Sequence, residues 1–340
     1  DVVGASLNGK LFLAYDTAAD RLMVYDPNLG TARIRVVGFS TPGAPTVANT
    51  GAGAYAATLR YYRVRWLQMS GSTIIRRSEA GASVSFTPSG SGTAARITLP
   101  TVPSEGETHW EIEASTDNSV WYLVWGEGGL DSELAIATTT KDDANTTSVY
   151  ASGATPDPAG FYGRFPSVKY LITDGNRLLG AGAWESTGAT SSGRNSTVWF
   201  TPVLGSADRG DDERVPNQTN QKNRLALNEN DGGVITGLGA IDGVPYAFKG
   251  RAIHKLRPTG DVTTPYLPDK IRGDIGSISH KAIAEGEDHA GNAALYFLSH
   301  RGPYRIVQVD GAHQVQYLGR DNEVTWRSIN LAASTVIAHS

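Results

Sequence analysis

The chain has 340 residues, a length that argues against a single small domain and favours two domains or one domain inserted in another. Its 30 Lys and Arg against 34 Asp and Glu give a formal net charge of −4, and the basic residues form no stripe, which argues against a sequence-specific nucleic-acid binder. The absence of Cys excludes disulfides, thiolate metal sites and Cys nucleophiles. No apolar run reaches the roughly 18 residues of a membrane span, so membrane insertion is not expected.

Residue usage predicts short strands joined by turns. The chain contains 39 Gly and 16 Pro but only two Met, and it is rich in Thr, Ser, Val and Tyr. We therefore predict a nearly all-β protein. Because the chain begins without Met and ends in the apolar stretch 331–338, we also expect that flanking sequence is missing or has been removed.

A hairpin pattern occurs four times, each time as two apolar runs on either side of a turn. The second hairpin differs from the others in having a long Gly- and Ser-rich loop, 186–195, between its strands. The paired runs are 9–15 with 21–27, 175–182 with 196–202, 242–249 with 252–256, and 291–298 with 303–309.

Such repeats indicate the blades of a β-propeller, in which small sheets pack radially and bury faces that no single sheet could bury alone. Four repeats are visible, whereas closed propellers have roughly four to eight blades. The predicted propeller is therefore either incomplete within this chain or closed by strands too degenerate to recognise.

Between the first two hairpins the sequence changes character, because strand patterns follow one another at short, regular intervals. This spacing predicts a β-sandwich of roughly 100 residues. Residues 62–66 resemble the central strand of a fibronectin type III module, and 109–115 resemble its late hairpin. The stretch 138–160 has few bulky apolar residues and is predicted to be the exit linker of the sandwich.

The predicted architecture is thus a β-propeller-like body with an inserted immunoglobulin- or fibronectin-like β-sandwich. We expect the first part of the propeller at 1–42, the sandwich at 43–150 and the remainder of the propeller at 151–340.

Catalytic chemistry has few candidates in this sequence. Acid catalysis on a sugar needs two carboxylates across a cleft, and Asp174, Asp242, Asp261 and Asp274 are candidates. Each lies in a turn-forming context, however, where local backbone hydrogen bonding explains an Asp side chain. No His-Glu-x-x-His motif, nucleophile elbow or dinucleotide fingerprint occurs.

The densest charge run is 208–213, whose carboxylates could in principle bind a hard cation such as calcium. The run lacks the alternating Asp or Asn ligands and the terminal Glu of a calcium loop, so we predict a solvated loop and no metal site.

Contact surfaces are expected on exposed Trp side chains and on the long polar loops 186–195 and 205–222, since loops on rigid scaffolds commonly carry binding. The candidate contact residues are Trp125, Trp184, Arg194, Asp208, Arg209, Asp211 and Asp212.

The order of these features resembles structural proteins of tailed bacteriophages that build a tail nozzle or knob from propeller-like subunits carrying an immunoglobulin-like module. The segments that carry the resemblance are 174–180, 197–201, 246–249 and 294–304. The resemblance implies a ring-forming virion subunit located in the tail, without enzymatic activity or cofactor. Its implied partners are copies of itself and other tail proteins.

Two other functions stay open. One is a carbohydrate-binding propeller or adhesin that recognises a host surface glycan, with the sandwich as a spacer. The other is a polysaccharide-degrading enzyme that depends on a carboxylate pair.

Overall fold

The structure is a computed structural model that describes residues 2–15, 21–31, 33–52, 57–89, 93–182, 196–203, 213–218, 222–228, 233–261, 263–309 and 311–329. Across these residues the regular structure is almost entirely strand, which confirms the predicted all-β class. The helical elements in this part of the chain are short: η1 (Thr147–Ser152), η2 (His280–Ala282), η3 (Arg320–Asn322) and α2 (Glu323–Ser328). In the same residues, no helix combines the length and the apolar character that a membrane crossing would require.

Backbone contacts divide the chain into two compact units. Unit 1 combines Asp1–Asn28, Phe165–Ser206 and Thr219–Ser340, and unit 2 combines Leu29–Arg164 with Ala207–Gln218. The expected domain limits at 42, 43–150 and 151 stay predictions.

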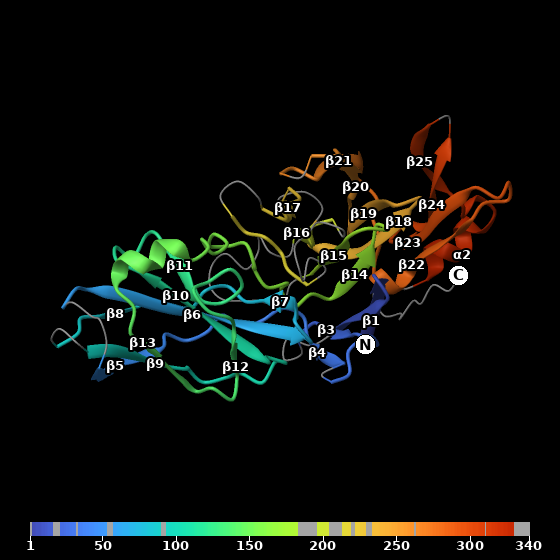
Figure 1. Ribbon diagram of the computed structural model, residues 1–340. Coiled ribbons are helices and arrows are strands. Elements are labelled where there is room, and N and C mark those ends of the chain that lie inside the picture. Colours follow the sequence, from blue (N-terminus) through green and yellow to red (C-terminus); the bar gives the residue numbers. More distant parts are fainter. Residues whose placement is uncertain are drawn as a thin grey trace. The chain divides into compact units, whose positions relative to one another are not determined.

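Within its described residues, unit 1 contains four antiparallel sheets that follow one another along the chain (Figure 1). In each sheet the strands of this unit lie in chain order, so each is a meander. The strands are β1 (Val2–Leu7), β2 (Lys10–Tyr15) and β3 (Met23–Tyr25); β14 (Tyr170–Thr173), β15 (Leu178–Ala181), β16 (Thr197–Phe200) and β17 (Arg224–Ala226); β18 (Ile235–Ile241), β19 (Val244–Lys249), β20 (Ile253–Pro258) and β21 (Tyr266–Arg272); and β22 (Ile283–Glu287), β23 (Ala293–Ser299), β24 (Gly302–Val309) and β25 (Ala312–Tyr317).

All four hairpins predicted from the sequence are confirmed. They are the antiparallel pairs formed by the second and third strands of the successive sheets, namely β2 with β3, β15 with β16, β19 with β20, and β23 with β24. The repeat read from the sequence is therefore a repeat of structure.

Successive sheets of unit 1 share hydrophobic cores. The second and third sheets form one cluster, to which Phe200 and Ala247 belong, and the third and fourth sheets form another, to which Phe248 and Phe297 belong. Because neighbouring residues of β19 point to opposite faces of the sheet, Ala247 packs toward the second sheet while Phe248 packs toward the fourth. The third sheet is thus buried on both faces.

Glycines in β18 allow the fourth sheet to approach closely. A Cβ atom added at Gly237 would lie 2.5 Å from Ile283 Cδ1 and 2.8 Å from His280 Cα, and one at Gly239 would lie 2.9 Å from Leu295 Cδ1. A glycine inside a strand often marks such an approach. Here it sets the spacing between β18 and the sheet that follows.

Unit 2 consists mainly of two antiparallel sheets (Figure 1). The larger has the order β11-β10-β6-β7, with β12 paired to β10 and β8 paired to β6, and the smaller has the order β13-β9-β5. The strands are β4 (Ile34–Val36), β5 (Thr46–Ala52), β6 (Arg60–Ser70), β7 (Thr73–Arg77), β8 (Val84–Phe86), β9 (Thr93–Thr98), β10 (His109–Ser115), β11 (Tyr122–Trp125), β12 (Leu134–Ala135) and β13 (Thr140–Asp143).

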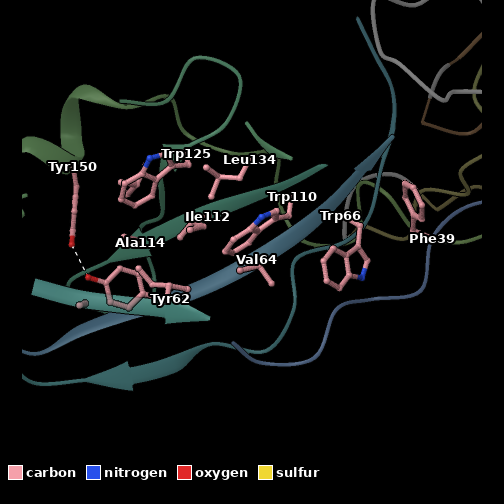
Figure 2. Close-up of a cluster of buried hydrophobic side chains, with 13 residues drawn as sticks. Phe39, Tyr62, Val64, Trp66, Trp110, Ile112, Ala114, Trp125, Leu134 and Tyr150 are labelled. Atoms are coloured by element: carbon pink, nitrogen blue, oxygen red, sulfur yellow. Dashed lines mark hydrogen bonds between the residues drawn. The ribbon is translucent and has the colours of Figure 1, made fainter. Parts of the chain in front are cut away.

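One hydrophobic cluster fills unit 2 and takes side chains from both of these sheets (Figure 2). Trp66 on β6 and Trp110 on β10 are directly paired across the larger sheet, and Ala95 and Ile97 come from β9 of the smaller one. Both Trp side chains are fully buried, which makes them the largest apolar contributors to this core.

The prediction that 138–160 is an exit linker is wrong, because this segment belongs to unit 2. Its residues form β13, which pairs with β9, and η1, which buries Tyr150 in the core of unit 2. The hydroxyl of Tyr150 donates to the Asp143 carboxylate. Polar composition hid this segment from sequence reasoning, because strand pairing with β9 and hydrogen bonds hold it in place, and Tyr150 is its one large side chain in the core.

Candidate functional site

A groove of about 480 Å³ runs along the first strands of the sheets of unit 1. Its walls come from every sheet of the unit, through Gly4 on β1, Ile172 on β14, Ala240 on β18 and Glu285 on β22. These strands also contact one another in chain order, β1 with β14, β14 with β18, and β18 with β22. The groove therefore marks a place where the repeated sheets converge.

An Asx-Gly turn joins the first and second strands of three of these sheets. Asn8 and Asp242 adopt positive φ angles of 52° and 49° directly before a glycine, as two-residue hairpin turns require. Asp174 also precedes a glycine, but here the positive φ angle is that of Gly175. The Asp174 side chain accepts the backbone N–H groups of Asn176 at 3.2 Å and Arg177 at 2.9 Å. The predicted turn role of Asp174 is thereby confirmed.

The four sugar-cleavage candidates lie in different surroundings. Asp174 and Asp242 line the groove, Asp261 lines a smaller pocket of about 290 Å³ that it shares with Asp174, and Asp274 lies in neither. Asp261 accepts the backbone N–H of Thr263 at 2.8 Å, and this bond lowers the pKa of Asp261. Its carboxylate is thus engaged in a turn, as the sequence predicted.

Asp174 also receives the hydroxyl of Tyr266, which reaches it from β21 of the third sheet. Burial raises the pKa of Tyr266 above its ordinary value, and the neighbouring Asp174 carboxylate adds to the shift.

Among the described residues, no three His, Asp or Glu side chains come together in a way that could hold a metal ion.

Further hydrogen bonds join successive sheets of unit 1. Lys249 Nζ, on the third sheet, donates to Ser196 Oγ at 3.2 Å and to Asn228 O at 2.5 Å. Ala240 N, on β18, donates to Glu285 Oε1 at 3.2 Å. Polar contacts therefore reinforce the apolar interfaces on both sides of the third sheet.

A second pocket in unit 1 is larger, at about 650 Å³, and differs in chemistry from the groove. It combines aromatic side chains from β24, β25 and α2 with an ionic group that includes Asp274. Sequence reasoning considered Asp274 alone and missed the pocket, because its walls come from elements spread over 272–326. The lining residues are Arg272, Asp274, Ile275, His300, Arg301, Tyr304, Val315, Tyr317, Glu323 and Trp326.

The expected exposure of Trp125 is wrong. Trp125 is only 4% exposed and belongs to the core of unit 2, beside Leu134 and Tyr150 (Figure 2). It ends β11, where its large apolar surface is more stable inside the core than in water. The other candidate contact residues lie outside the described residues: Trp184, Arg194, Asp208, Arg209, Asp211 and Asp212.

A network of buried charges in unit 2 was also missed. Glu213, the last residue of the predicted solvated loop, is 2% exposed and accepts hydrogen bonds from Arg35 and from Arg76 Nη1, the latter at 3.4 Å. The solvated-loop prediction is therefore wrong for Glu213. Burial lowers the pKa of Arg76 to about 10.

The same kind of pairing recurs on the larger sheet of unit 2. Glu113 on β10 accepts from both Arg63 and Arg65 on β6. The sequence does contain a signal for these ion pairs. Arg63 and Arg65 alternate along β6, Glu111 and Glu113 alternate along the facing strand β10, and charged residues in facing strands can form cross-strand pairs. These cross-strand pairs join β6 to β10 within unit 2.

The chain matches no protein-family model, and a search of curated proteins found no similar one.

Proposed function

We propose that the chain is a non-enzymatic structural subunit of a bacteriophage tail, of the nozzle or knob kind, that assembles with its own copies into a ring. In this proposal unit 1 is a four-bladed, propeller-like body, and unit 2 is an inserted fibronectin type III-like β-sandwich.

The observation that carries the proposal is the convergence of four consecutive meander sheets on one groove. Their first strands contact one another in chain order and line the same groove. A propeller places the first strand of each blade next to its central channel, so this arrangement supports a propeller-like body. The two cores shared by the second, third and fourth sheets support blade-on-blade packing.

The sandwich assignment rests on the two sheets of unit 2 and the single core to which both contribute. Sheets that bury a common layer of side chains are typical of β-sandwiches. The resemblance of 62–66 and 109–115 to fibronectin type III strands falls on β6 and β10, which pair with each other.

A structural role fits the way in which unit 2 is held together internally. Arg76 Nη1 donates to Val36 O at 2.9 Å and Gly38 O at 3.1 Å, and Glu79 accepts the N–H of Gly160 at 2.9 Å. Val36 and Gly38 lie near the start of the stretch Leu29–Arg164 of unit 2, and Gly160 lies near its end. These bonds tie both ends of that stretch to β7 and to the residues that follow it. In the proposal unit 1 supplies the wall, and unit 2 is displayed outward or contacts a neighbouring subunit.

Light scattering on the purified full chain over a range of concentrations tests the ring. We expect a single oligomeric species with a defined number of copies, because virion rings are closed assemblies. A strictly monomeric chain at high concentration would contradict the proposal.

A further inference from the structure

The larger pocket of unit 1 combines aromatic and ionic walls. Its volume of about 650 Å³ lies within the range of roughly 300–1,000 Å³ that small-molecule sites occupy. The pocket is formed by the end of β21 and the residues after it, the β23–β24 turn, β24, β25 and α2.

The ionic side of the pocket is organised by Asp274. Its Oδ1 lies 3.2 Å from Arg272 Nε, and its Oδ2 accepts from Arg301 Nη1 at 3.1 Å. All three side chains are about half exposed, so they face solvent at the pocket rather than a closed core. A carboxylate between two guanidinium groups presents fixed acceptors beside fixed donors.

The aromatic side of the pocket is formed by Tyr304, Tyr317 and Trp326. The rings of Tyr304 and Tyr317 lie 5.0 Å apart at an angle of 47°, and Tyr304 in turn stacks on Phe297 at 5.6 Å. Tyr304 and Phe297 both belong to the hydrophobic cluster of the third and fourth sheets, so the Tyr304 ring packs against that cluster. Trp326 and Tyr317 are partly buried residues that line the pocket.

The charges of the lining balance. Arg272 and Arg301 are offset by Asp274 and Glu323, and both guanidinium groups already contact the Asp274 carboxylate. An anion would have to approach two carboxylates, and a cation two guanidinium groups. The pocket therefore favours an uncharged ligand that offers many hydrogen-bonding groups and an apolar face.

We propose that this pocket binds a neutral oligosaccharide. Each sugar hydroxyl both donates and accepts, which matches the alternation of guanidinium donors and carboxylate acceptors around Asp274. The C–H face of a pyranose ring is apolar and packs on the rings of Tyr317 and Trp326. All residues that line the pocket belong to one chain.

A glycan array probed with the labelled full chain tests the site. The array carries neutral oligosaccharides, including maltotriose, cellotriose and chitotriose, beside sialylated and uronic acid-containing ones. Titration calorimetry then gives the dissociation constant of the best ligand for the wild type and for three variants. Two variants alter the pocket, Trp326→Ala and Asp274→Asn.

The third variant, Asp269→Asn, is the matched control. Asp269 is a half-exposed carboxylate that accepts from Arg257 Nε at 2.9 Å, also in unit 1 but outside the pocket lining. We expect a neutral glycan to bind. Asp274→Asn should reduce the affinity at least roughly tenfold, since a hydrogen bond to a charged group contributes about that much. Trp326→Ala should reduce the affinity by roughly tenfold, through loss of the aromatic face on which the sugar packs. The control is expected to stay within about twofold of the wild type, as for an exposed pair outside the site.

Three results would overturn the proposal. They are the absence of binding to any neutral oligosaccharide, binding confined to acidic glycans, and binding that both pocket variants leave unchanged. Because the array reports on the ligand pocket and light scattering on assembly, failure of one proposal is distinguishable from failure of the other.

Discussion

His280 Nδ1 accepts the backbone N–H of Leu238 at 3.3 Å, and this bond joins the short turn η2 to the first strand of the preceding sheet. The His280 ring also packs against Tyr170 of β14, with centroids 5.1 Å apart. One side chain thus contacts the second and third sheets just before the fourth sheet begins. Protonation of Nδ1 would replace the acceptor of the Leu238 N–H with a donor.

The first prediction concerns pH. Burial lowers the pKa of His280 from 6.5 to about 4, so between these values the unfolded chain binds a proton that the folded chain excludes. The contribution of neutral His280 to the free energy of unfolding is fully present above pH 6.5. It is lost as the pH falls toward 4, by roughly 3 kcal/mol in total. His280→Gln retains a hydrogen-bond acceptor and should flatten this dependence, as measured by urea unfolding at pH 7 and pH 4.5. Equal losses for both proteins would refute the assignment.

The second prediction concerns the close approach of sheets at β18. Gly239→Val should weaken the packing of the third and fourth sheets, because its Cβ would lie 2.9 Å from the Leu295 side chain and β-branching adds further bulk. Gly286→Ala is the control, since its Cβ meets Tyr296 at an ordinary 3.4 Å. Calorimetry should show a lower melting temperature for the first variant and little change for the second. If both melt alike, β18 does not set the spacing.

The third prediction tests the buried charges of unit 2. Glu113→Ala leaves Arg63 and Arg65 without their shared carboxylate inside the unit, and such a loss costs about 3–5 kcal/mol. Asp142→Ala removes a partner from the exposed Arg96 pair and should change stability little. Urea unfolding followed by tryptophan fluorescence compares the two. A mild effect of Glu113→Ala would mean that solvent reaches the network.

The fourth prediction tests the core of unit 2. Trp110 is fully buried in the hydrophobic cluster of unit 2, and its Nε1 donates to Thr138 O at 3.0 Å. Trp110→Ala should cost about 3–5 kcal/mol through the cavity it leaves. Val120→Ala, at a half-exposed position, serves as the control and should be nearly neutral. Comparable destabilisation by the two substitutions would contradict a single tightly packed core.

Sequence reasoning found the second and third strands of each sheet because these strands are the apolar ones. In β19 the large side chains Val244, Tyr246 and Phe248 alternate with smaller ones, and β23 carries the continuous apolar run 295–298, and both patterns between glycine turns are strong strand signals. The first and fourth strands of each sheet carry a weaker strand signal. Β22, for example, reads Ile-Ala-Glu-Gly-Glu, and β18 contains two glycines, so neither has the alternation of a half-buried strand.

The candidate sites were less accessible to such reasoning. The turn role of Asp174 follows from its local sequence, because the backbone N–H groups that it accepts lie two and three residues away, whereas its contact with Tyr266 depends on the fold. Glu213 looked solvated because its buried partners Arg35 and Arg76 lie more than a hundred residues away. The aromatic pocket likewise depends on elements that only the fold brings together.

The measurement that tests the central claim most directly is single-particle electron microscopy of the purified full chain. The account predicts closed rings with rotational symmetry, in which a map resolves unit 1 as four blades around the groove formed by β1, β14, β18 and β22. Particles that stay single, or a map in which these strands do not converge, would contradict it.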